Sequence, residues 1–124
     1  MVRLTLICLA AAAVIAGCRI PGTPEPSVTN LKFVPSAFDS FRSNAELKFS
    51  LTAPATVSIR IRAGSPGGRV VRTLADDLRE TKGSHAVAWL GDTDERLFAP
   101  AGIYFGVVVT GGAAYEANVQ VFHY

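Results

Sequence analysis

Three carboxylates stand close together in one polar segment of this 124-residue chain. Asp92, Asp94 and Glu95 fall in the turn-rich sequence GDTDERLFAPAG. Oxygen-rich loops of this kind bind Ca2+, often weakly in extracellular modules. The spacing is not that of an EF-hand, however, and Arg96 follows directly. We therefore favour a solvated acidic turn over a calcium site.

A hydroxyl and an imidazole are neighbours at Ser84 and His85, the residue types of a nucleophile and its general base. Successive residues of a strand point to opposite faces, which argues against such a pair. His123 has no ligand-like spacing to His85 that would suggest a zinc site. The sequence therefore predicts a protein that is not an enzyme and holds no metal or cofactor.

Three cationic side chains, Lys48, Arg60 and Arg62, take the outward positions of two strands that we expect to be neighbours. Together they could bind anionic lipid head groups or acidic glycans. The alternative is an ordinary solvated sheet face balanced by Glu46, and we favour it because charged outward positions are usual in antiparallel sheets.

Of the two cysteines, Cys8 lies inside an N-terminal apolar run, and the thiol of Cys18 lies in the sequence VIAGCRIPG. It follows Arg3 and an apolar run of about 13 residues, shorter than the roughly 20 that a transmembrane helix needs. This is the form of a secretory signal peptide. The alternative, a structural cysteine after an ordinary cleavage site, is disfavoured because a lone thiol in an exported chain has no partner.

The residues Ile15-Ala16-Gly17-Cys18 resemble the lipobox of bacterial lipoproteins. The resemblance implies cleavage before Cys18, a diacylglycerol on its sulfur and a fatty acid such as palmitate on its new amino group. Arg19 in place of an aspartate further implies the outer membrane in a diderm bacterium. We thus expect a signal peptide (1–17), a lipidated cysteine with a Pro-rich tether (18–27) and a folded domain (28–124).

Charge excludes one class of partner. The chain has 12 basic and 10 acidic residues, and the loss of residues 1–17 removes only Arg3 among them. A nearly neutral exported chain is a poor candidate for binding nucleic acid. The membrane, through the lipid, and another envelope protein are the expected partners.

Period-two alternation after the tether predicts strands. The expected strands are 28–34, 45–51, 57–62, 69–74, 85–90, 103–110 and 114–122, with a polar connection, ADDLRETKG, after the fourth. The second and third are expected to form a hairpin about Ala53-Pro54-Ala55, and the last two about Gly111-Gly112. This pattern favours an all-β fold, an antiparallel immunoglobulin-like β-sandwich of about seven strands. A small closed barrel is the alternative. The expected core comprises Leu47, Phe49, Val57, Ile59, Val87, Trp89, Ile103, Phe105, Val107, Val119 and Val121.

One long stretch, GSHAVAWLGDTDERLFAPAGIYFGVVV, resembles the immunoglobulin-like domain of flagellar hook-capping (FlgD-type) proteins. The match is carried by Gly83, His85, Val87, Trp89 and Gly91, then by Pro100, Ala101, Gly102 and Tyr104. Leu90 stands where that family has an aspartate, and Asp92 is the nearest carboxylate that could replace it. The resemblance implies that Trp89 anchors the core rather than stacking on a sugar. It also implies that the Tyr104 hydroxyl is bound to the backbone.

The family resemblance implies a domain that supports larger exported assemblies through its surface and sheet edges. We accordingly expect a membrane-anchored lipoprotein with a non-enzymatic interaction or assembly module in the bacterial cell envelope. The alternative is a glycan- or lipid-head-group-binding module at the cell surface.

Overall fold

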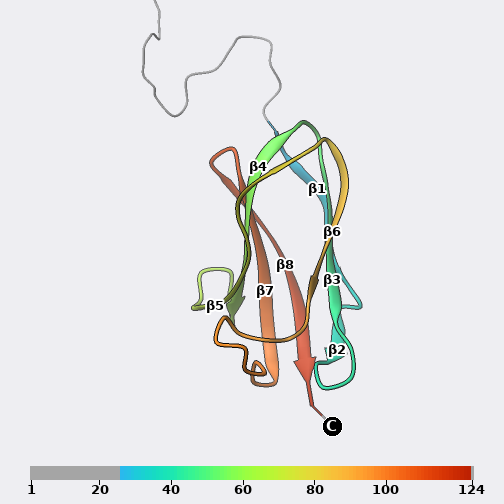
Figure 1. Cartoon of the computed structure of the whole chain (residues 1–124), viewed down its shortest axis with the longest axis vertical. Helices are drawn as coiled ribbons and strands as arrows, with labels where there is room; N and C mark the ends of the chain where they lie inside the picture. The colour runs from blue at the N-terminus through green and yellow to red at the C-terminus, as the bar shows by residue number, and fades with distance from the viewer. Residues whose placement is uncertain (1–25, 124) are drawn as a thin grey trace, which may run out of the picture.

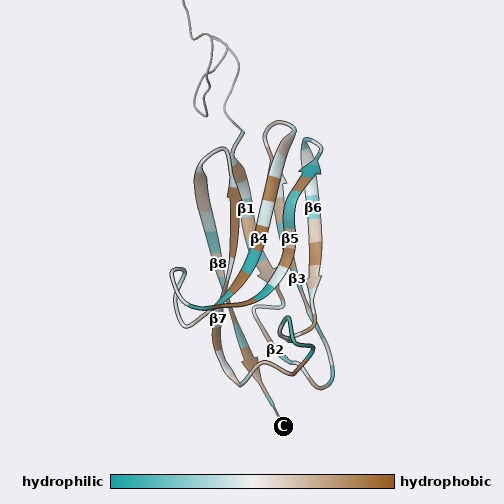
Figure 2. Cartoon of the chain, turned by 60° about the vertical axis from the view of Figure 1, so that its left-hand side comes forward, coloured by the Kyte–Doolittle hydropathy of each residue, from teal (hydrophilic) through white to brown (hydrophobic). Residues whose placement is uncertain are grey.

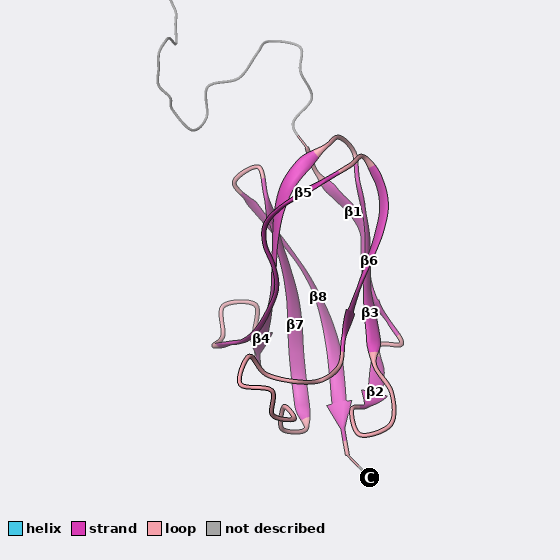
Figure 3. Cartoon of the chain, viewed as in Figure 1, coloured by secondary structure: helices cyan, strands magenta, loops and turns pink. Residues whose placement is uncertain are grey.

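The computed structural model describes residues 26–123. The expected signal peptide, Cys18 and the tether up to residue 25 lie outside the described residues. The described part is all-β and contains no helix (Figures 1 and 3). Its eight strands are β1 (Val28–Val34), β2 (Ala37–Asp39), β3 (Ala45–Leu51), β4 (Ala55–Ala63), β5 (Val70–Glu80), β6 (Gly83–Trp89), β7 (Gly102–Thr110) and β8 (Ala113–Phe122).

The strands form two separate sheets, which excludes a single closed barrel. One sheet has the order β1-β3-β6 and the other the order β2-β8-β7-β4-β5. The chain changes sheet after β1, at the cis Val34–Pro35 peptide bond, so that the short β2 joins the second sheet. β2 pairs parallel with β8, while all other pairs are antiparallel. The expectation of a wholly antiparallel fold is therefore wrong at this one strand, which the sequence pattern did not predict.

The expected hairpin between residues 45–51 and 57–62 is also wrong. β3 pairs with β1 and β6, whereas β4 pairs with β5 and β7, so the turn at residues 52–54 carries the chain from one sheet to the other. The hairpin at Gly111-Gly112 is confirmed, because β7 and β8 pair along their whole length. The segment expected to be a polar connection instead extends β5 to Glu80, since Ala55–Val57 of β4 supply its backbone partners.

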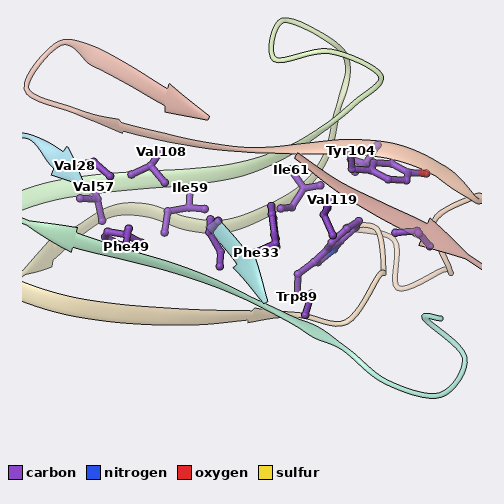
Figure 4. Packing of buried hydrophobic residues seen from close by; sticks show 14 of the residues in the cluster. Val28, Phe33, Phe49, Val57, Ile59, Ile61, Trp89, Tyr104, Val108 and Val119 are labelled. Atoms are coloured by element: carbon purple, nitrogen blue, oxygen red, sulfur yellow. The ribbon is translucent and has the colours of Figure 1, made fainter. Parts of the chain in front are cut away.

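A single hydrophobic cluster fills the space between the two sheets (Figure 4). Most of the expected core is confirmed as buried, although Val107 lies outside this cluster: Leu47, Phe49, Val57, Ile59, Trp89, Val107, Val119 and Val121. Val87 and Phe105 are half-buried, and Ile103 is wrong, because 45% of it is exposed.

The prediction for Ile103 is wrong because the inward and outward residues of β7 alternate one position away from where they were expected. The inward positions of this strand are Tyr104, Gly106 and Val108, one residue out of step with the expectation. Tyr104 packs edge-on against Trp89, with ring centroids 5.3 Å apart. Gly106 leaves room for Phe33, whose ring would lie 2.8 Å from any Cβ placed there. A one-residue slip would exchange the two faces of the strand.

The described chain begins and ends at opposite ends of the molecule (Figure 1). Ser27 is fixed to the β3–β4 turn, since its N–H donates to Thr52 Oγ1 at 3.0 Å and its carbonyl accepts from Thr52 N–H at 3.1 Å. We call this the proximal end, and it also holds the β5–β6 and β7–β8 turns. The distal end holds the β2–β3 loop (40–44), the β6–β7 loop (90–101) and His123.

Candidate protein-binding site

Four large apolar side chains are exposed to solvent at the distal end. Phe41 is 51% exposed, Leu90 54%, Leu97 65% and Phe98 58%. We call these four residues the distal apolar cluster. The Phe41 and Phe98 rings meet edge to face with centroids 4.5 Å apart, which joins the two distal loops. On its other side Phe41 stacks on the His123 ring at 4.2 Å. Exposed apolar patches on a folded domain are typical of interaction sites.

The β2–β3 loop holds Phe41 through one carboxyl group. Asp39 is buried, and its Oδ1 accepts a hydrogen bond from the Phe41 N–H at 3.0 Å. Its carbonyl accepts from the N–H groups of Arg42 and Ser43 at 3.0 and 2.9 Å. Such local side-chain to backbone bonding is why aspartate is common in turns. The loop is therefore rigidly built while its aromatic side chain stays exposed.

The β6–β7 loop is a small hairpin that presents Leu97 and Phe98. The Ala99 N–H donates to the Gly91 carbonyl at 2.8 Å, and the Thr93 N–H to the Leu97 carbonyl at 2.8 Å. Fully buried Trp89 fixes the base of the hairpin by donating from Nε1 to the Asp92 carbonyl at 2.9 Å. At the far end of the loop, the Tyr104 hydroxyl donates to the Pro100 carbonyl. The expected roles of Trp89 and Tyr104 are thus confirmed.

Two carboxylates of the same loop, Asp92 and Asp94, pair with protein groups. Arg72 Nε lies 3.7 Å from Asp92 Oδ1, and Arg72 Nη1 lies 3.4 Å from Asp94 Oδ1. Asp94 Oδ1 also accepts the Thr73 N–H at 3.0 Å. Glu95 is exposed, and no group of three or more metal-ligating side chains exists within residues 26–123. The arrangement fits the acidic turn that the sequence favours, pinned to β5 by one arginine.

A shallow groove of about 470 Å3 runs between the two distal loops. Leu90, Leu97 and Phe98 supply its apolar wall, Arg42 and Arg96 supply cations, and Asp92 adds a carboxylate that is paired with Arg72. Arg42 Nε lies 3.4 Å from Asp39 Oδ2 but most of its side chain faces solvent, and Arg96 has no ion pair within residues 26–123. The groove therefore combines apolar surface with positive charge, a composition suited to an apolar protein segment that carries carboxylates.

The three cations singled out from the sequence do not share a face. Lys48 lies on β3 and Arg60 and Arg62 on β4, in different sheets. Each has its own partner: Lys48 Nζ lies 3.9 Å from Glu46, Arg60 Nη2 lies 3.0 Å from Asp76, and Arg62 Nη1 donates to the Gly68 carbonyl at 2.8 Å. A single anionic-ligand patch would require that these residues lie on adjacent strands, and this premise is therefore wrong.

The serine and histidine of β6 are also separated. Ser84 is exposed and its Oγ lies 3.4 Å from Ser50 Oγ. His85 points the other way, with Nε2 2.7 Å from the Thr81 carbonyl oxygen and Nδ1 3.8 Å from Glu80 Oε1. Within residues 26–123, no hydroxyl is hydrogen-bonded to this imidazole. Cys18, the expected lipid site, lies outside the described residues.

Sequence reasoning missed the distal apolar cluster because its members come from two loops far apart in the chain. One local signal was available. Leu97 and Phe98 are large apolar residues inside an otherwise polar, turn-rich segment. Two such side chains in a solvated loop are expected either to be buried against the domain or to contact a binding partner.

Comparison of the chain with protein-family models and with curated proteins finds no match. Within residues 26–123, no helix is long and apolar enough to cross a membrane.

Proposed function

We propose that this chain is a lipid-anchored, non-enzymatic interaction module of the bacterial cell envelope, and that it binds a partner protein through the distal apolar cluster. One observation carries the proposal: four large apolar side chains are held exposed on hydrogen-bonded loops at the end farthest from where the domain begins. A chain of this kind would support an assembly rather than catalyse a reaction.

The composition of the cluster suits a binding hot spot. Aromatic residues and arginine dominate the energetic centres of protein interfaces, and here Phe41 and Phe98 lie beside Arg42 and Arg96. Both loops are already fixed by backbone hydrogen bonds. Association would therefore order little additional chain, which lowers the entropic cost of binding.

The position of the cluster suits an anchored protein. Ser27 is bonded to Thr52, and Pro26 lies near the β7–β8 turn, where a Cβ on Gly111 would be 3.6 Å from the Pro26 carbonyl oxygen. The last tether residues thus lie against the proximal end. Strands of nine or ten residues at about 3.3 Å each place the distal end roughly 30 Å farther out. A lipid on Cys18 would leave the cluster facing away from the membrane.

The domain is best described as an immunoglobulin-like sandwich. Supporting features are two facing sheets, a first strand divided between them, and a fully buried tryptophan in the core. A tyrosine near the start of β7 whose hydroxyl binds backbone four residues upstream resembles the tyrosine corner of such sandwiches. These features agree with the proposed kinship to the hook-capping type of domain.

The binding site is tested by photocrosslinking in cells. A photoreactive amino acid at Phe98 of the full chain should give one reproducible protein adduct, and the same group at exposed Glu116 of β8 should not. Leu97→Ser should weaken that adduct about tenfold, as loss of an interface hot spot does. Adducts of equal yield from both positions, or an adduct indifferent to Leu97→Ser, would contradict the proposal.

The anchor is tested separately. Cys18→Ala should leave an unprocessed or soluble chain, while the parent chain stays with the membrane after a carbonate wash. If the Cys18→Ala chain fractionates with membranes unchanged, the lipoprotein interpretation fails, whatever the outcome at the distal end.

A further inference from the structure

We infer that β6 is an acceptor edge, to which an extended segment of a partner protein adds as a further strand, with an acidic side chain directed toward Lys48. The inference rests on the proposed interaction role of the domain, but it concerns a different surface from the distal apolar cluster. It follows from comparing the four edges of the two sheets.

Three of the four edges carry features that oppose strand addition. β2 has only three residues. β1 has a register shift against β3 between Thr29 and Lys32, and Asn30 between them has φ 55°. β5 has three register shifts against β4, a left-handed Asp77 with φ 52°, and a run of charged residues along its last part (Figure 2). Bulges, short strands and charges are the usual means by which proteins protect an edge.

β6 has none of these protections after its first residue, Gly83, which has φ 116°. It pairs with β3 over all seven residues without a register shift, and within residues 26–123 it pairs with no other strand. The outward residues of the strand are Ser84, Ala86 and Ala88, which are small and uncharged. Its second row of backbone N–H and C=O groups therefore faces a position where a new strand fits without steric or charge conflict.

The neighbouring sheet face indicates what that strand should carry. A hollow of about 530 Å3 lies over Ser50, Ser84 and Ala86, and Lys32 and Lys48 contribute to its lining. Lys48 is opposite Ala86 on one side and Lys32 on the other. Glu46, 3.9 Å from Lys48, is the only carboxylate paired with either lysine within the described residues. The hollow is therefore positively charged.

The geometry allows a direct contact across β6. A residue of the added strand opposite Ala86 would stand two strand spacings, roughly 10 Å, from Lys48. The intervening alanine is too short to separate them, and a glutamate and a lysine side chain together span that distance. Backbone pairing would supply affinity in this mode, and the lysines would select an acidic residue at one position.

The test uses the full chain in detergent micelles with two blocked peptides, Ac-TVTVEVTVT-NH2 and Ac-TVTVKVTVT-NH2. Amide hydrogen exchange should show protection of residues 84–88 by the glutamate peptide, with no new protection in β5. Binding of the lysine peptide should be about fivefold weaker, the scale of a cross-strand charge pair. Lys48→Glu, an exposed change, should reverse this preference.

Several results would overturn the inference: no protection of β6 by either peptide at millimolar concentration, protection of β5 instead, or equal binding of both peptides. A dimer of the chain alone that Ala86→Lys dissociates would show that the edge serves a second copy rather than a partner strand. Leu97→Ser should leave peptide binding unchanged. If the peptides do not bind but the photocrosslinked adduct at Phe98 still forms, only the inference about β6 is rejected. If the peptides bind but no adduct forms at Phe98, only the proposed distal site is rejected.

Discussion

Replacing Trp89 by alanine should destabilise the domain strongly and loosen the distal site at the same time. Trp89 is fully buried, and it contacts Phe38 edge-on at 5.8 Å and Tyr104 at 5.3 Å between ring centroids. It also donates the hydrogen bond that fixes the Asp92 carbonyl at the base of the β6–β7 hairpin. One side chain therefore connects the core to the loop that presents Leu97 and Phe98.

The size of the effect follows from these contacts. Truncation of a buried tryptophan to alanine costs about 3–5 kcal/mol, mostly through the cavity it leaves. The lost hydrogen bond adds about 1 kcal/mol. A domain of this size has roughly 5–15 kcal/mol of total stability, so the variant should be marginal and its Tm lower by about 15–50 °C. Trp89→Phe, which keeps a ring but no donor, should lose only about 1–2 kcal/mol.

The assay is urea unfolding of the full chain followed by far-UV circular dichroism, because Trp89 is the only tryptophan and its fluorescence disappears in the variants. Leu90→Ala, at the adjacent exposed position, is the matched control and should change stability by less than about 0.5 kcal/mol. Amide exchange in Trp89→Phe should accelerate at residues 91–99 while the strands stay protected. A neutral Trp89→Ala, or a Trp89→Phe loop as protected as the parent, would refute this account of the site.

Three further predictions concern the loops of the distal end. Gly91→Ala should lower the free energy of unfolding more than Gly112→Ala does. Both glycines have φ near +75°, but only at Gly91 would the new Cβ collide with another atom, 2.4 Å from Ser40 Cβ. Unfolding curves of the two variants measure the difference, and equal losses of stability would mean that Ser40 moves aside. Burial raises the pKa of the Tyr104 phenol, and the charge of nearby Arg69 partly opposes this rise. The neutral phenol therefore contributes its full stabilisation of the fold below about pH 10, and this contribution is lost as the pH rises through the raised pKa. Tyr104→Phe should cost about 1 kcal/mol at neutral pH and flatten the fall in stability above pH 10, and an unaltered alkaline profile would argue against this role of the hydroxyl. Calcium at about 5 mM should leave the Tm unchanged, because Arg72 already neutralises Asp92 and Asp94, and a clear rise would restore the calcium-loop hypothesis.

The strands could be predicted from the sequence because alternation is a local property, whereas their partners could not. All seven expected strands exist, but the sequence predicts one hairpin from residues 45–51 and 57–62, which belong to different sheets. A turn such as Ala53-Pro54 serves equally for a hairpin and for a crossover between sheets. The choice depends on which distant strands complete each sheet, here β1 and β6 on one side and β5 and β7 on the other.

The inward face of β7 was unpredictable for a different reason. Residues 103–109 are almost entirely apolar, so period two gives no phase, and only the packing of Tyr104 on Trp89 decides it. The same limit applies to the distal apolar cluster. Phe41 and Phe98 are 57 positions apart in the chain, and their contact depends on β2 joining the second sheet, which no local pattern indicates.

The start of the first strand and the distal loops lie at opposite ends of the domain, and this determines how the domain would carry mechanical load. Tension between a membrane anchor before Ser27 and a partner at Phe98 would act along the strands, because the strands run from one end to the other. The hydrogen bonds between β1 and β3 lie across that direction. They would have to shear together rather than open one after another, as they would if both attachments were at one end. The fold would therefore hold under a steady pull and act as a stiff link.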